Sequence, residues 1–242
     1  MEFVSREHFD TYLSGIQYLG QGCQGVCYLN TRNNTVYKVF NDYFDEEDAG
    51  YTKDFLLRFS DIKNSTFIWP NNVIIVAGTI VGYTMPYVKA KNLCDINPLQ
   101  VNLDKLEEAT IRAEKDIKLL TDSNVKLYDV RYNILYNNGK MYVIDTLDYN
   151  NSKTTYIENR RPVDDELMLF LVDNYFDYFV ENDKLLNAMY REYGVRGVDF
   201  LKVFRSKLSE YAGKDITKLS EVKHLVRKNK DHIYQRGVYY DK

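Results

Sequence analysis

Two groups of residues in this 242-residue chain have types and spacings that suit phosphate chemistry. The first group is a G-x-G-x-x-G pattern followed by a lysine 13 residues later: Gly20, Gly22, Gly25 and Lys38. Glycine lets a backbone approach a phosphate closely, because a Cβ would block the approach. A lysine on the next strand can reach the same phosphates as a point charge. The glycines precede an extended segment rather than a helix, which disfavours a dinucleotide-binding βαβ unit and favours a nucleotide clamp.

The second group consists of three oxygen-bearing side chains, Asp129, Asn133 and Asp145. We expect Asp129 and Asn133 in a turn between strands, where side chains face a cleft. Asp145 ends an apolar strand, where an unpaired carboxylate is costly unless it binds a cation or a hydrogen-bond donor. Oxygen ligands from Asn133 and Asp145 suit Mg²⁺, which keeps substrate phosphate in its coordination shell. The alternative is that Asp129 and Asn133 only cap a turn.

The elements that must position the first group are mostly strands. The sequence predicts strands on either side of the glycines, a helix with an acidic first turn, and a hairpin through Gly78. The expected ranges are 16–20, 25–30 and 35–40 for the strands, 45–62 for the helix, and 73–77 with 80–88 for the hairpin. Residues 89–103 read as a connector.

The second group lies among segments that are mostly helical. A buried stripe at steps of three and four residues predicts a long helix, with the stripe made by Leu106, Ala109, Ala113, Ile117 and Leu120. Short strands at 125–128 and 141–144, an apolar helix at 164–180 and two or three amphipathic helices over 183–236 follow. We therefore expect an α+β protein with a β-rich lobe containing one helix, residues 1–88, and a helical lobe, residues 89–242.

Composition restricts the class of protein further. The net charge of −3 argues against a whole-molecule nucleic-acid binder. The sequence has no apolar run of about 18 residues and no apolar core of a signal peptide near its start, so we expect no membrane association and a cytoplasmic location. The three cysteines have no metal-ligand spacing.

In this order, the motifs of the first lobe resemble those of the protein-kinase-like fold family, as in a small, divergent bacterial or phage member. Gly20, Gly22 and Gly25 match its glycine-rich loop, and Lys38 matches its phosphate-binding lysine. The segment 83–88 resembles the last strand of the small lobe running into the hinge. By this resemblance Met85 is the gatekeeper, and Tyr87 and Val88 are hinge residues beside the nucleotide.

The second lobe carries the rest of the resemblance. The matched positions are the catalytic-loop aspartate, the basic residue two further on, the metal-binding asparagine and the metal-binding aspartate, which are Asp129, Arg131, Asn133 and Asp145. The pair Asp164 and Asp165 resembles the aspartate that braces the catalytic loop. Glu46, Glu47 and Asp54 are candidates for the acid that pairs with Lys38, with Glu47 favoured.

The sequence departs from the family pattern at four places. Leu127-Tyr128 replaces His-Arg, the catalytic loop from Asp129 to Asn133 is one residue short, Asp145-Thr146-Leu147 lacks the glycine of D-F-G, and no A-P-E is present. A phosphate on the activation loop would therefore lack its usual arginine partner.

The resemblance implies an ATP- and Mg²⁺-dependent phosphotransferase that moves the γ-phosphoryl to a hydroxyl acceptor. A Ser or Thr side chain of a protein is favoured over a small molecule as that acceptor. Asp129 would accept the hydroxyl proton and Arg131 would stabilise the transferred charge. Two alternatives stay open: a pseudokinase that acts as a nucleotide-responsive binding module, and a kinase-fold nucleotidyltransferase.

Overall fold

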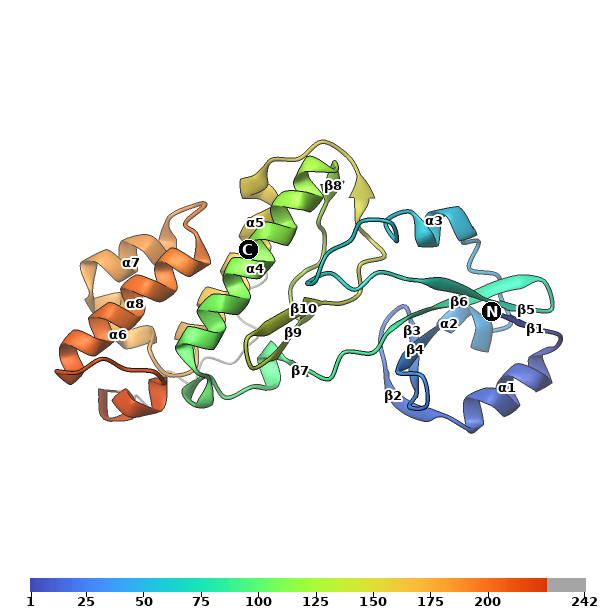
Figure 1. Ribbon diagram of the computed structural model, residues 1–242, viewed down its shortest axis with the longest axis horizontal. Helices are drawn as coiled ribbons and strands as arrows, with labels where there is room; N and C mark the ends of the chain where they lie inside the picture. Colours follow the sequence, from blue (N-terminus) through green and yellow to red (C-terminus); the bar gives the residue numbers. More distant parts are fainter. Residues whose placement is uncertain (226–242) are drawn as a thin grey trace. The chain divides into compact units, whose positions relative to one another are not determined.

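The structure, a computed structural model, describes residues 1–225 and divides the chain into two units after Lys89 (Figure 1). Strands dominate the first unit and helices the second, so the α+β class expected from the sequence is confirmed. None of the helices in residues 1–225 combines the length and apolar character needed to cross a membrane.

A six-stranded mixed sheet forms the first unit, in the order β1-β5-β6-β4-β3-β2. Its strands are β1 (Glu2–Phe3), β2 (Gln17–Gln21), β3 (Gly25–Asn30), β4 (Thr35–Phe40), β5 (Asn72–Val76) and β6 (Thr79–Pro86). All neighbours pair antiparallel except β1 and β5. The hairpin of β5 and β6 turns at Ala77 and Gly78, whose φ values of 50° and 86° suit a two-residue turn of type I′. The strands predicted around the glycines and the hairpin are therefore confirmed to within two residues at each end.

The helices of the first unit differ from the expected single helix. An unpredicted helix, α1 (Arg6–Ser14), begins after the N-cap Ser5 and buries Phe9 and Leu13 in a core with Tyr37, Val39 and Ile74. The predicted helix at 45–62 is wrong, because α3 (Lys53–Leu57) is the only helix within that range, and a second short helix, α2 (Asn41–Phe44), ends before it. Positive φ at Glu46 and Gly50 interrupts the helical path between them, and Thr52 caps the start of α3.

In the second unit, the predicted long helix is confirmed as α4 (Leu103–Asp122), and all five residues of its apolar stripe are buried. Beside it lie small sheets: β7 (Lys91–Asn92), β9 (Ile134–Asn137) and β10 (Lys140–Val143) form one, and β8 (Val125–Lys126) with β11 (Asn150–Asn151) forms another. The predicted strands at 125–128 and 141–144 thus exist in shorter or shifted form. Strand β9, which pairs with β10 in a hairpin, was not predicted.

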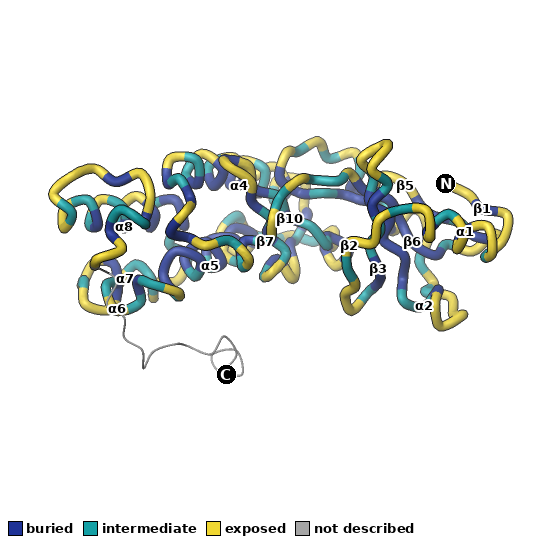
Figure 2. The backbone as a smooth tube through the Cα atoms, turned by 90° about the horizontal axis from the view of Figure 1, so that it is seen from below, coloured by how far each residue is buried: buried dark blue, intermediate teal, exposed yellow. Residues whose placement is uncertain are grey.

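The remaining described helices are α5 (Tyr156–Val172), α6 (Asp177–Asn182), α7 (Lys184–Arg191) and α8 (Gly197–Ala212), with short 3₁₀ segments at Leu93–Asp95, Pro98–Gln100 and Leu219–Leu225. The apolar helix expected at 164–180 begins earlier, at Tyr156, because Thr155 and Glu158 form a capping box that fixes its start. It ends at Val172. Buried residues run along much of α5 (Figure 2). The helices expected over 183–236 are present up to residue 225, and positions 226–236 lie outside the described residues.

Candidate functional site

The glycine motif spans the tight turn between β2 and β3, with Gly20 in β2, Gly22 in the turn and Gly25 at the start of β3. The amide of Gly22 donates to the carbonyl of Gly25 at 2.9 Å, which closes the turn. The Asn41 side chain donates to the carbonyl of Cys23 at 2.8 Å and thereby ties the turn to the start of α2. The glycine segment is therefore a fixed turn of the sheet rather than a loose loop.

The three glycines are needed for different reasons. A Cβ on Gly25 would lie 2.2 Å from the carbonyl oxygen of Val39, so the packing of β3 on β4 requires glycine there. A Cβ on Gly20 or Gly22 would meet no described atom within 4 Å, and neither residue has a positive φ. Packing and backbone conformation thus leave these two glycines unexplained. The open space above them is what a backbone cradle for phosphate needs.

We expect Gly25→Ala to destabilise the protein much more than Gly22→Ala. The first should lower the free energy of unfolding by roughly 1–3 kcal/mol, because backbone must move to admit the methyl group. The second should change it by less than about 1 kcal/mol. Urea unfolding followed by fluorescence of Trp69, the single tryptophan, reports on the same unit. Equal losses for the two variants would contradict the distinction between the glycines.

Lys38 lies on β4 with only 6% of its surface exposed. Its ammonium group donates to Oε1 of Gln24, in the glycine turn, at 2.9 Å and lies 5.9 Å from the ring centre of Tyr83. The predicted proximity of the lysine and the glycine motif is therefore present within this unit. Gln24 was not singled out from the sequence, because a glutamine at the variable position of a turn carries no recognisable signal.

The acid expected to pair with Lys38 is not in place. Glu47 lies in the non-helical connection between α2 and α3, is exposed, and forms no ion pair within the described residues. The carboxylate of Glu46 instead lies 3.7 Å from the guanidinium group of Arg6. Asp54 is exposed in the first turn of α3. The predicted pair of Lys38 and Glu47 is thus not formed in this structure, because the helix that was to present Glu47 does not form.

The predicted hinge residues follow the end of β6. Met85 is buried and pairs with Val36 across the sheet. Tyr87 and Val88 are half-buried, and the amide of Tyr87 donates to the carbonyl of Asn34 at 2.9 Å. That amide is therefore engaged by the chain itself, while contact of these residues with a nucleotide stays a prediction.

In the second unit, the structure brings Asp129, Asn133 and Asp145 together. The Asn133 side chain donates to the carbonyl of Asp129 at 2.7 Å. The carbonyl of Asn133 accepts from the amide of Ile144 at 3.0 Å, which joins the start of β9 to the end of β10 directly before Asp145. Asn133 therefore links the other two residues through its side chain and its backbone.

The backbone around these residues is strained. Asp129, Tyr132 and Asp145 have φ values of 47°, 64° and 58°, in the left-handed region that non-glycine residues seldom adopt. Aspartate tolerates this conformation better than most residues, but each instance still costs about 1–3 kcal/mol and such residues cluster at functional sites. Two of the three candidate residues thus adopt a conformation that packing alone would not favour.

Tyr149 is a further member of this group that the sequence analysis missed. Its side chain is buried, and burial raises the pKa of its phenol, with the negative charges of Asp129 and Asp145 raising it further. The phenol is therefore close enough to both carboxylates for their charges to raise its pKa. An aromatic residue four positions after Asp145 is the only trace of this in the sequence.

Arg131 is half-buried and belongs to the same loop, two residues after Asp129. Its guanidinium lies 5.1 Å from the ring centre of Tyr132. Burial raises the pKa of Asp165 on α5, and the positive charges of Arg161 and Arg131 oppose that rise. Arg131 is thus close enough to Asp165 to influence its charge, and its role towards a phosphoryl group stays a prediction.

Asn159 anchors the segment that leads into the loop, a role that the sequence did not assign to it. The Asn159 side chain, 1% exposed, accepts from the amide of Leu127 at 3.0 Å and donates to the carbonyl of Val125 at 2.8 Å. Asp164 instead lies 3.1 Å from Arg160 and accepts from the amide of Gly197 at 2.8 Å, and burial raises its pKa to about 7. The earlier start of α5 places Asn159 beside the segment before the loop, and a bracing role of Asp165, which lies close enough to Arg131 for the two charges to interact, stays a prediction.

The donor set determines what metal the second unit could hold. Within residues 1–225, no three side chains of the His, Cys, Asp and Glu types lie together as a metal site. Asn133 and Asp145 would therefore need oxygen ligands from elsewhere. This fits Mg²⁺, which binds through one or two carboxylates together with substrate phosphates and water.

Comparison with known proteins yields no match, either to a protein-family model or to a curated protein.

Proposed function

We propose that the chain is an ATP- and Mg²⁺-dependent phosphotransferase of the protein-kinase-like fold. It transfers the γ-phosphoryl group to a hydroxyl acceptor, with a Ser or Thr side chain favoured over a small molecule. The observation that supports this most is the link through Asn133, whose hydrogen bonds hold Asp129 and the segment before Asp145 together. The contact of the buried Lys38 with the glycine turn supports it from the other unit.

Each group in the chain has a distinct role in this proposal. Bound Mg²⁺-ATP supplies the phosphoryl group and a metal charge that offsets the charge of the phosphates. Lys38 and the open positions at Gly20 and Gly22 hold the phosphates, and Asn133 and Asp145 provide oxygen ligands for the metal. The exposed carboxylate of Asp129 orients the acceptor hydroxyl and accepts its proton.

A second candidate is a binding module that recognises a nucleotide without transferring its phosphate. Two observations favour it: Gln24 engages the ammonium group of Lys38, and the loop from Asp129 to Asn133 is one residue short of the family pattern. Nucleotide binding is common to both candidates, and transfer separates them.

We expect Mg²⁺-ATP to raise the thermal stability of the protein. Nucleotide at 100 times its Kd should add about 2.7 kcal/mol to the free energy of unfolding by mass action. A thermal-shift titration with and without Mg²⁺ measures this, with Lys38→Ala as the test variant and Lys63→Ala, an exposed lysine of the same unit, as its control. If ATP and GTP caused no shift with or without the metal, nucleotide binding would be refuted and both candidates with it.

A further inference from the structure

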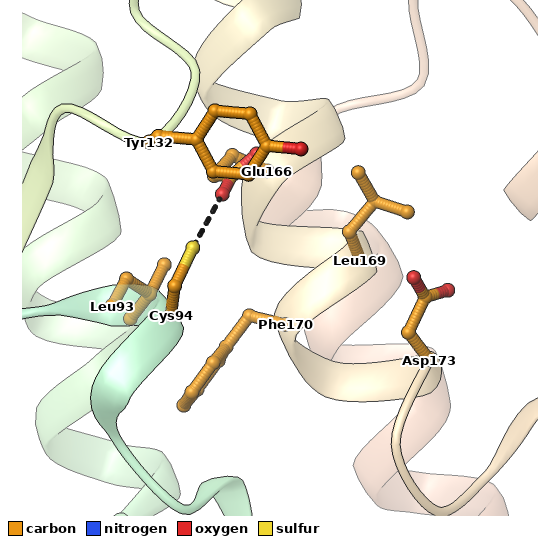
Figure 3. A pocket seen from close by; sticks show the side chains of 7 residues that line it. All are labelled: Leu93, Cys94, Tyr132, Glu166, Leu169, Phe170 and Asp173. Carbon is orange, nitrogen blue, oxygen red and sulfur yellow. Dashed lines mark hydrogen bonds between the residues drawn. The ribbon is translucent and has the colours of Figure 1, made fainter. Parts of the chain in front are cut away.

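A small pocket in the second unit contains chemistry that the proposed roles do not use (Figure 3). It has a volume of about 30 Å³ and is lined by Leu93, Cys94, Tyr132, Glu166, Leu169, Phe170 and Asp173. This volume has room for about two water-sized groups. The pocket can therefore hold the tip of a ligand, not a whole one.

The polar centre of the pocket is the carboxylate of Glu166. Only 7% of this residue is exposed, and its Oε1 accepts from the thiol of Cys94 at 3.4 Å, across the pocket in Figure 3. A thiol is a weak donor, and no cationic side chain pairs with Glu166 within the described residues. A buried carboxylate with so weak a partner is costly unless a cation joins it.

The other lining residues restrict which cation fits. Leu93, Leu169 and Phe170 provide apolar walls, which suit a methylene chain. Asp173 adds a second carboxylate, although its Oδ1 already accepts from the hydroxyl of Tyr190 at 3.2 Å. A compact ammonium group with its last methylene fits this space, whereas a planar guanidinium of four heavy atoms is too large.

The pocket also adjoins the candidate catalytic loop. Tyr132 belongs to that loop, three residues after Asp129, and its carbonyl accepts a hydrogen bond from the side chain of Asn92. Asn92 directly precedes Leu93 and Cys94, so this hydrogen bond joins that wall of the pocket to the loop.

We propose that this pocket binds a primary ammonium group at the end of an alkyl chain, with Glu166 as its counter-ion. In the phosphotransferase, the ammonium belongs to the hydroxyl acceptor, which makes amine-bearing acceptors such as lysine-containing peptides the preferred class. This assignment to the acceptor rests on the proposed function, whereas ammonium binding itself does not.

The test is a titration of the full chain, labelled at leucine methyl groups, with three probes: pentylammonium chloride, 1-pentanol and pentylguanidinium chloride at matched ionic strength. The methyl signals of Leu93 and Leu169 report on the pocket, and Leu208, buried in α8, serves as an internal control. We expect saturable shifts at the two pocket leucines with pentylammonium, and at least tenfold weaker binding of the other two probes. Glu166→Gln should weaken pentylammonium binding at least tenfold, whereas Glu192→Gln, an exposed glutamate, should not.

Binding of pentanol or pentylguanidinium as tight as that of pentylammonium would overturn the proposal, as would unchanged binding to Glu166→Gln. If that variant failed to fold, the comparison of the three probes on the unaltered chain would decide alone. Ammonium binding without phosphoryl transfer would refute the proposed function and leave the pocket assignment standing. Transfer without any preference for the ammonium probe would do the reverse.

Discussion

Replacing Asp129 with Asn should reduce phosphoryl transfer by about 10²–10⁴-fold, the usual contribution of a positioned general base. The amide has nearly the same shape as the carboxylate but cannot accept the hydroxyl proton. Asparagine also tolerates the positive φ of this position, so the loop should keep its conformation. Because the group acts on the acceptor, the affinity for ATP should change by no more than about threefold.

Single-turnover transfer and a separate nucleotide titration measure the two quantities for Asp129→Asn. Asp122→Asn, an exposed aspartate at the end of α4, is the matched control and should leave both unchanged. A variant of Asp129 that lost nucleotide affinity as severely as turnover would contradict the assigned role.

Replacing Asp145 with Asn should have its largest effect on binding. Loss of a charged metal ligand should weaken the affinity for Mg²⁺-ATP by at least about tenfold, as the loss of supporting groups around metals commonly does. Asparagine again suits the φ of 58° at this position, so the hairpin of β9 and β10 should persist. Calorimetric titration with ATP in Mg²⁺ and in EDTA separates the contribution of the metal from that of the phosphates.

The metal dependence is the decisive feature of this second variant. We expect the unaltered protein to bind ATP more tightly with Mg²⁺, and the Asp145→Asn variant to lose most of that difference. Identical behaviour of the Asp129 and Asp145 variants in both assays would show that the two roles are not separate.

The parts of the fold that could be predicted were those with local signals. Alternating apolar residues and turn chemistry located β3, β4 and the hairpin of β5 and β6, and the apolar stripe located α4. The helix at 45–62 failed because an acidic first turn is a weak signal, and a backbone with positive φ at Glu46 and Gly50 overrides it. The start of α5 was missed although Thr155 and Glu158 carry a capping-box pattern.

The residues of the candidate site also fall into those that the sequence predicted and those that it did not. The proximity of Asp129, Asn133 and Asp145 was predicted from residue type and order along the chain, and the structure brings them together, whereas their roles stay predictions. Gln24, Tyr149 and Asn159 were missed because their roles depend on tertiary contacts that their residue types do not signal. Asn159 contacts residues more than 30 positions away in sequence, which no local pattern encodes.

The most direct test of the central claim compares transfer of label from γ-³²P-ATP and α-³²P-ATP to a panel of protein and small-molecule hydroxyl acceptors in the presence of Mg²⁺. We expect label from the γ position to appear on an acceptor, to require Lys38 and Asp129, and to be absent when the α position is labelled. Label from the α position would establish nucleotidyl transfer instead. Absence of any transfer by folded protein that binds Mg²⁺-ATP would contradict the phosphotransferase and leave the nucleotide-responsive binding module.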